Sequence, residues 1–97
     1  MEGDPAEGVL EHIGANVHRL RVQRGMSQEA LAEAADISTR FLQSVERGKT
    51  NLGVVVLVRL ARALEVPPAA LLRRAALPEA KKGRPRKAGP KGSTPGQ

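Results

Sequence analysis

Polar side chains that can form hydrogen bonds recur along residues 39–47 at the spacing of a helix. The apolar residues of this stretch and its lead-in, Ile37, Leu42 and Val45, lie between them at intervals that keep them on the opposite side. The polar set is Thr39, Arg40, Gln43, Ser44 and Arg47. Arg can donate two hydrogen bonds to the major-groove edge of guanine, Gln can pair doubly with adenine, and Ser or Thr can contact several bases. Such a face, without an acidic group before Glu46, has the chemistry to read DNA through Thr39, Arg40, Gln43 and Ser44.

This face needs two helices to position it, and residues 27–49 predict them. The apolar pattern is helical over residues 27–35 and 38–47, with one interruption at residues 36–38. Asp36 tolerates a left-handed backbone, whereas Ser27 and Ser38 are of the type that caps a helix N-terminus. Ala32 is small enough for two backbones to cross closely, and Gly48 ends the second helix. We therefore predict a helix-turn-helix.

The pattern extends beyond the two helices. The segments IGANVHRLRVQRGMSQEALAEAADIS, SVERGKT and LVRLARALEV, spread over residues 13–72, resemble the Cro/cI-type (XRE family) helix-turn-helix domain. This resemblance implies an all-α, five-helix lambda-repressor-like domain that binds double-stranded DNA. Relatives of this kind often dimerise near the C-terminal end of the domain, so the resemblance also implies a homodimer.

The resemblance assigns roles to three further residues. Arg21 and Glu46 match positions that form a salt bridge in the family, which would tie the first helix to the end of the third; the alternative is two separately solvated charges. Gln28 matches a residue that contacts a DNA phosphate, assisted by free backbone N–H groups at the helix start; the alternative is a solvated first-turn side chain. The expected phosphate contacts are Gln28, Ser38, Arg47, Lys49, Thr50 and Asn51.

Three more helices are expected around this unit. The first covers residues 9 or 10 to 24, with Ile13, Val17 and Leu20 on one face and Gly25 as its stop. The fourth covers residues 53 or 54 to 64 and should bury Val54, Leu57, Leu60, Ala61 and Leu64. The fifth starts at Pro67-Pro68, carries Leu71 and Leu72, and ends by Pro78.

Some apolar side chains cannot all fit in a single core. The run Val54-Val55-Val56, followed by Val58, encircles the fourth helix, so part of it must be exposed. An exposed apolar surface is either scattered and neutral or a contiguous interface. Phe41, the single aromatic residue, either covers the edge of the core or contacts DNA.

Composition excludes several classes of function. The 97 residues suit one small domain, and the absence of Cys rules out disulfides, thiol chemistry and Cys-containing zinc sites. His12 and His18 are six residues apart, a spacing that does not place them side by side on a helix, and they read as helix-surface residues. We expect no enzyme activity, catalytic residue, cofactor or metal.

The positive charge is concentrated at the C-terminal end. The net charge is +6 overall; residues 1–78 hold ten Lys or Arg against nine Asp or Glu, whereas residues 79–97 hold six against one. We therefore expect a disordered lead-in over residues 1–8, the helix-turn-helix domain over residues 9–77, and a basic disordered tail over residues 78–97. No apolar run is long enough to span a membrane, so we expect a soluble, unexported protein. The absence of Cys fits a reducing, cytoplasmic setting, and we expect a cytoplasmic, nucleoid-associated protein.

The tail contains a motif with its own chemistry. The stretch Lys82, Gly83, Arg84, Pro85, Arg86 and Lys87 resembles an AT-hook, in which Arg side chains enter the narrow minor groove of A·T-rich DNA. The alternative is a tail that binds phosphates without sequence preference or that only aids solubility.

The sequence thus predicts a sequence-specific DNA-binding transcriptional regulator, a repressor or a small controller, that acts as a homodimer. Two alternatives remain: an antitoxin-like module that binds a protein partner, and a nucleoid-type DNA binder that uses its basic tail.

Deletion of residues 79–97 tests the AT-hook. If the hook is real, the truncated chain loses more affinity for sites flanked by A·T pairs than for sites flanked by G·C pairs, since only A-tracts offer the narrow groove. Equal losses on both flanks, with a shallower dependence of affinity on salt, would instead show plain phosphate binding. Binding of labelled duplexes over a salt series measures both.

Overall fold

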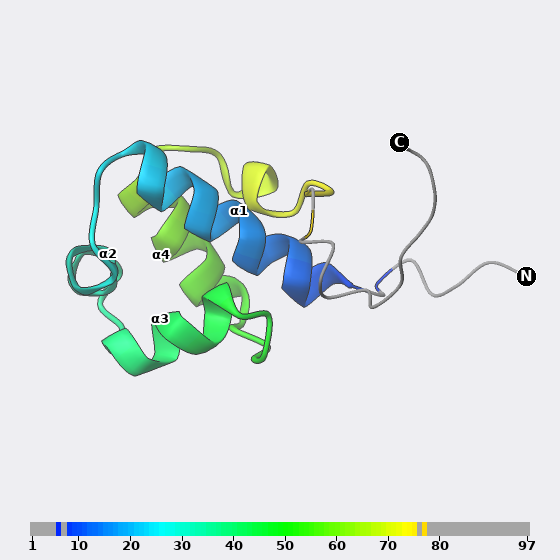
Figure 1. The fold of residues 1–97 in the computed structure, drawn as a ribbon, viewed down its shortest axis with the longest axis horizontal. Helices are drawn as coiled ribbons and strands as arrows, with labels where there is room; N and C mark the ends of the chain where they lie inside the picture. The colour runs from blue at the N-terminus through cyan, green and yellow to red at the C-terminus, as the bar shows by residue number, and fades with distance from the viewer. Residues whose placement is uncertain (1–5, 7, 76, 78–97) are drawn as a thin grey trace, which may run out of the picture.

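The described part of the chain folds into four α-helices and one short 3-10 helix (Figure 1). The computed structural model describes residue 6, residues 8–75 and residue 77. The elements are α1 (Val9–Gln23), α2 (Gln28–Ala35), α3 (Thr39–Glu46), α4 (Val54–Leu64) and η1 (Pro68–Leu71). The first four agree closely with the helices that the sequence predicts, and the all-α class is confirmed.

The helices pack around a small shared core. In Figure 1, α2 is seen end-on while α3 lies across the view, so the two helices of the motif cross steeply. Helix α1 packs against α3 and η1, and α4 packs against α2 and η1. Each helix of the helix-turn-helix therefore packs against a supporting helix, α3 against α1 and α2 against α4.

The core draws on every element. The predicted inward residues of α1, Ile13 and Val17, are buried, and Leu20 is partly buried against them. The remaining buried apolar residues are Leu31, Ala32, Ala35, Leu42, Val45, Leu52, Leu60, Ala61, Leu64 and Leu71. Phe41 and Ile37 pack against the edge of this core, which confirms the first of the two readings of Phe41.

The start of α4 differs from the prediction. Val54 was expected in the core but is 75% exposed, because it is the first residue of the helix and Leu52, two residues earlier, takes the buried position instead. Gly53 joins them with φ 84° and ψ 156°, a conformation that only glycine adopts without strain. Val55 and Val58 are exposed as well.

The fifth α-helix of the prediction is absent from the described residues. Only the four-residue 3-10 helix η1 forms, with Leu71 buried and Leu72 half exposed. The amide nitrogen of Asn16 donates to the carbonyl oxygens of Leu71 and Arg73, at 3.0 and 2.8 Å, and the N–H of Ala75 donates to His12 Nδ1 at 2.9 Å. These backbone groups bond to α1 side chains, so they are not paired with one another in a helix.

Helices α1 and α3 meet backbone to backbone at Gly14. A Cβ atom at this position would lie 2.4 Å from the carbonyl oxygen of Val45 and 2.8 Å from that of Glu46. No side chain fits there without a shift of one helix. The glycine in the middle of α1 thus sets the distance between α1 and the end of α3.

Some of the sequence predictions fall on residues that the structure does not describe. The AT-hook-like stretch, residues 82–87, lies entirely outside the described residues, as does most of the lead-in of residues 1–8.

The left-handed backbone of Asp36 gives a stability prediction. Its φ is 60°, so Asp36→Gly should raise the free energy of unfolding by up to about 1 kcal/mol, since glycine has no Cβ to strain. Thermal melting measures the change. Glu33→Gly, three residues earlier on the exposed side of α2, is the matched control and should lower stability by about 1 kcal/mol. A lower melting temperature for Asp36→Gly would contradict this account of the turn.

Candidate nucleic-acid interface

The turn between α2 and α3 is fixed by local hydrogen bonds. Helix α2 ends at Ala35, and the left-handed backbone of the next residue, Asp36, lets the N–H of Ile37 donate to the carbonyl of Ala32 at 3.0 Å. The hydroxyl oxygen of Ser38 then accepts from the N–H of Phe41 at 3.0 Å and caps α3. Both predicted features of the turn, the left-handed Asp36 and the Ser38 cap, are confirmed.

Helix α3 presents one apolar and one polar side. Leu42 and Val45 are buried, which fixes the rotation of the helix about its axis. On the polar side, Arg40 is exposed, whereas Thr39, Gln43 and Ser44 are half-buried. The four predicted base-reading side chains therefore lie on one short helix whose orientation is set by its core residues.

Gln28, the first residue of α2, is hydrogen-bonded to two side chains of α3. Ser27 caps this helix by accepting the N–H of Ala30 at 3.0 Å. The Gln28 amide nitrogen donates to Glu46 Oε1 at 3.0 Å, and its carbonyl oxygen lies 3.4 Å from the Gln43 amide nitrogen, which donates to it. A predicted phosphate residue and a predicted base reader are thus in direct contact.

The Arg21 and Glu46 side chains form an ion pair between α1 and α3. Arg21 Nε donates to Glu46 Oε2 at 2.7 Å, and Arg21 Nη2 donates to Glu46 Oε1 at 3.2 Å, a two-pronged geometry. The side chains are only 12% and 6% exposed. Arg21 Nη1 also donates to the carbonyl of Met26 at 2.9 Å, so the guanidinium holds the α1–α2 loop as well.

Glu46 is held in its charged form by its neighbours. Burial acts to raise the pKa of Glu46, but hydrogen bonds from Arg21, Gln28 and His18, together with the positive charge of Arg21, outweigh burial and lower that pKa below its ordinary value. His18 Nδ1 lies 3.3 Å from Glu46 Oε1 and 3.2 Å from Arg21 Nη2. This nitrogen accepts from Arg21 when it carries no proton and donates to Glu46 when it does.

The predicted phosphate-binding residues after α3 lie in the loop that follows it. Arg47, Lys49 and Asn51 are exposed, and Thr50 is half-buried. Gly48 has φ 72°, and a Cβ there would lie 2.9 Å from the Cα of Glu11, so this loop sits tightly against the start of α1. Ser38 is exposed at the other end of α3, where its hydroxyl hydrogen remains available as a donor.

Sequence reasoning missed three contributors to this arrangement. His12 was expected to be a plain surface residue, but its ring accepts a backbone N–H from Ala75. Asn16 is 1% exposed and makes the contacts to the 71–73 backbone, and Gly14 lies at the α1–α3 crossing. A glycine and an asparagine inside a helical pattern were the available signals, since both residues are unfavourable there.

The described residues contain neither a cluster of metal-ligand side chains nor a membrane-spanning helix. Within them, no group of three or more His, Asp or Glu side chains could ligate a metal ion. Among the same residues, no helix has the length and apolar character needed to cross a bilayer.

Comparison with known proteins shows the family and the fold of the chain. The model of the Helix-turn-helix family HTH_3, whose members are DNA-binding proteins of the XRE, or Cro/cI, type, matches residues 17–71. The chain belongs to this family. The members of this family are transcriptional regulators and not enzymes.

Individual relatives match the same region. The chain is 41% identical over 54 residues to an uncharacterized HTH-type transcriptional regulator, y4dJ, of Sinorhizobium fredii, which covers 56% of this chain and 70% of that protein. It is 38% identical over 55 residues to the transcriptional regulator RamB of Mycobacterium tuberculosis, but this match spans only 12% of RamB. The similarity to RamB is therefore confined to one part of that protein.

Solved structures show the same fold. The restriction-modification controller protein C.AhdI of Aeromonas hydrophila superposes with a TM-score of 0.62 at 35% identity, over 64% of this chain and 94% of that one. The clp gene regulator ClgR of Corynebacterium glutamicum superposes with a TM-score of 0.66 at 29% identity, over 70% of this chain and 72% of the ClgR chain.

The buried Glu46 predicts a stability effect that depends on pH. Its folded-state pKa lies below the ordinary value of a glutamate, so the carboxylate stabilises the fold fully above that ordinary pKa, and the stabilisation is lost as pH falls through the folded-state pKa. Glu46→Gln should lower the free energy of unfolding by about 3 kcal/mol at neutral pH, because Arg21 loses its partner. Denaturant unfolding from pH 7 to pH 3 measures the gap between variant and wild type, which should narrow on acidification.

Glu33→Gln is the control, since Glu33 is exposed on α2. It should leave the unfolding free energy within about 0.5 kcal/mol of the wild-type value. A gap between Glu46→Gln and wild type that is absent, or that widens at low pH, would contradict the role given to this carboxylate.

Proposed function

We propose that this protein is a sequence-specific regulator that binds operator DNA by placing α3 in the major groove. The polar side of α3, with Arg40 exposed and Thr39, Gln43 and Ser44 beside it, supports the proposal. An α-helix fits the major groove, and these side-chain types match the donor and acceptor pattern of base edges there. Arg40 is then a reader of guanine and Gln43 a reader of adenine.

The backbone of the DNA is held on either side of α3. The exposed Arg47, Lys49 and Asn51 follow α3 directly, and Thr50 lies between them. Gln28 and Ser38 stand at the N-termini of α2 and α3, where free N–H groups favour a phosphate. Such contacts give affinity and register but do not carry sequence information.

Regulation follows from occupancy of the operator. We place the protein in the cytoplasm, as a repressor or a small controller that blocks or positions the transcription machinery by binding. The clp gene regulator ClgR and the controller protein C.AhdI are regulators that share this fold.

Selection of preferred sites from a random duplex pool tests the proposal. At fixed salt the purified protein should enrich one motif, and Arg40→Ala should relax one base-pair position in each half-site by about tenfold. Lys49→Ala should instead weaken binding to all sequences alike, because a phosphate contact does not discriminate. Enrichment of no motif, with binding that simply falls as salt rises, would reject sequence-specific recognition.

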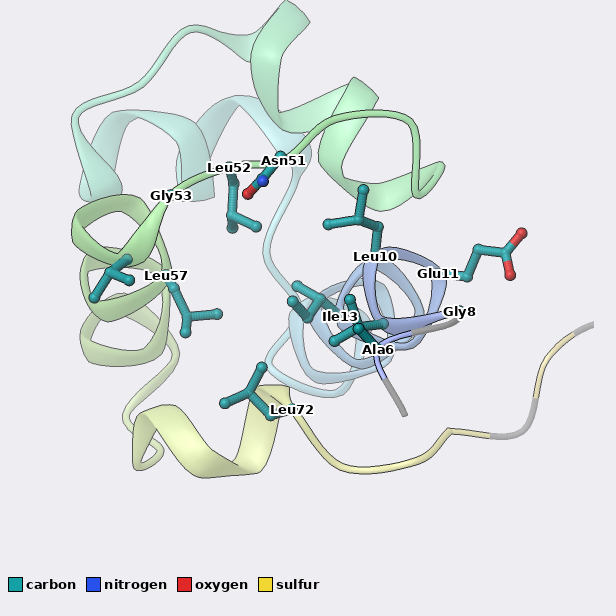
Figure 2. Close-up of a pocket in the computed structure, with 12 residues that line it drawn as sticks. Ala6, Gly8, Leu10, Glu11, Ile13, Asn51, Leu52, Gly53, Leu57 and Leu72 are labelled. Atoms are coloured by element: carbon teal, nitrogen blue, oxygen red, sulfur yellow. The ribbon is translucent and has the colours of Figure 1, made fainter. Parts of the chain in front are cut away.

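The operator-bound form is a homodimer that pairs through the start of α4. Val54, Val55 and Val58 are 75%, 64% and 45% exposed on this helix, and Leu72 is 49% exposed nearby. Two of these residues, Val54 and Leu72, line a cavity of about 480 Å³ (Figure 2). Its lining is mainly apolar and includes Leu10, Ile13, Leu52 and Leu57.

A second copy suits this surface because one patch can serve both partners of a two-fold dimer, with exposed valines of each copy meeting the cavity of the other. Two-fold pairing would place two copies of α3 about 34 Å apart, one turn of DNA, so that each reads one half-site. The motif recovered from the random pool should then be a palindrome.

Sedimentation of the double variant Val54→Gln and Val58→Gln tests the dimer. The wild type should sediment as a dimer and the variant as a monomer with at least tenfold weaker operator binding, since the substitutions remove apolar area without changing charge. Val22→Gln is the control, as Val22 is 55% exposed on α1, and it should stay dimeric. A wild type that remains monomeric at high concentration with operator present would reject the dimer, and a co-purifying stoichiometric partner would favour the antitoxin-like alternative.

A further inference from the structure

We propose that Glu46, acting through Gln28, fixes the direction of the Gln43 amide and so makes Gln43 selective for adenine. The inference rests on the proposed function, in which α3 enters the major groove. It adds positioning roles for two residues that do not themselves face the bases: Glu46 at the end of α3, and Gln28 at the start of α2.

The first step is the contact between Glu46 and Gln28. The carboxylate is 6% exposed and is held by Arg21 at 2.7 and 3.2 Å, so it has a fixed position. An ionised carboxylate has no hydrogen to donate and can only accept. Gln28 must therefore turn its amide nitrogen toward Glu46, and the two atoms are 3.0 Å apart.

The second step carries this direction from α2 to α3. With its nitrogen on Glu46, Gln28 turns its carbonyl oxygen toward Gln43. That oxygen has only lone pairs to offer, so Gln43 must in turn present its amide nitrogen, which lies 3.4 Å away. The orientation of the Gln43 amide thus follows from the charge on Glu46 through two hydrogen bonds.

Only some of the hydrogen-bonding groups of Gln43 remain available to DNA. One of its two N–H groups is engaged by Gln28, so the amide can offer one N–H donor and its carbonyl acceptor. Adenine presents one acceptor, N7, and one donor, the N6 amino group, in the major groove. Guanine presents two acceptors, O6 and N7, and would need two donors. The remaining pair therefore complements adenine and not guanine.

Gln28 keeps one N–H of its own for a DNA phosphate, so it has two separable effects. As a phosphate contact it raises affinity for every sequence alike. As a positioning residue it changes the preference at a single base pair, the one that Gln43 reads. A specificity measurement distinguishes these effects, whereas an affinity measurement does not.

The test compares Gln28→Met with wild type on duplexes that carry each of the four base pairs at every half-site position. Methionine has a similar length but neither amide group. Wild type should prefer A·T by about tenfold at the position that Gln43→Ala relaxes. In Gln28→Met that preference should fall to about twofold or less, with the other positions unchanged. Asn51→Ala, a phosphate-side control, should lower affinity for all duplexes equally.

Two results would overturn the inference while leaving the proposed function intact. One is a uniform loss of affinity in Gln28→Met with the preference at the Gln43 position preserved. The other is a position relaxed by Gln43→Ala that is not A·T. Failure of the wild-type protein to show any base preference would instead remove the proposed function, and this inference with it.

A second measurement needs neither DNA nor a substitution. When wild type is acidified in an NMR titration, the side-chain amide signals of Gln28 and Gln43 should move with the same midpoint, because protonated Glu46 loses its charge and is no longer an acceptor only, so it ceases to fix the direction of either amide. Gln23, exposed at the end of α1, is the internal control and should not follow that midpoint. A Gln43 signal that stays still while Gln28 moves would show that the direction is not transmitted.

Discussion

The arrangement of this domain depends on one nearly buried carboxylate where three helices meet. Glu46 ends α3, accepts both prongs of the Arg21 guanidinium from α1, and accepts the Gln28 amide from the start of α2. A charge so little exposed is tolerated only because each of these donors is in place. The same contacts therefore fix the position of α3 relative to the rest of the domain and the side chains that line its polar side.

The helices and the turn between α2 and α3 could be predicted from the sequence, because they depend on residues close together in the chain. Helical periodicity located four helices, and the side-chain types of Ser38 and Asp36 predicted the cap and the left-handed turn that join α2 to α3. The resemblance to Cro/cI-type domains supplied the pairing of Arg21 with Glu46, which connects residues too far apart in sequence for periodicity to relate them.

The features that the sequence did not predict depend on contacts between segments far apart in the chain. A fifth helix was expected after Pro67-Pro68, but Asn16 and His12 on α1 bind the backbone of residues 71–75, and periodicity carries no signal for such bonds. Val54 was placed in the core because its spacing fits, whereas Leu52 and the unusual backbone of Gly53 set the real start of α4. The contact of Gln28 with Gln43 likewise arises from how α2 and α3 cross.

Methylation interference with dimethyl sulfate tests most directly whether α3 reads the major groove. The reagent marks guanine at N7 in the major groove and adenine at N3 in the minor groove, so one experiment reports on both. With a recovered operator, N7 methylation of guanines within each half-site should block binding, because Arg40 and its neighbours on α3 need that edge. Interference confined to adenine N3, or no interference within the half-sites, would contradict recognition by α3.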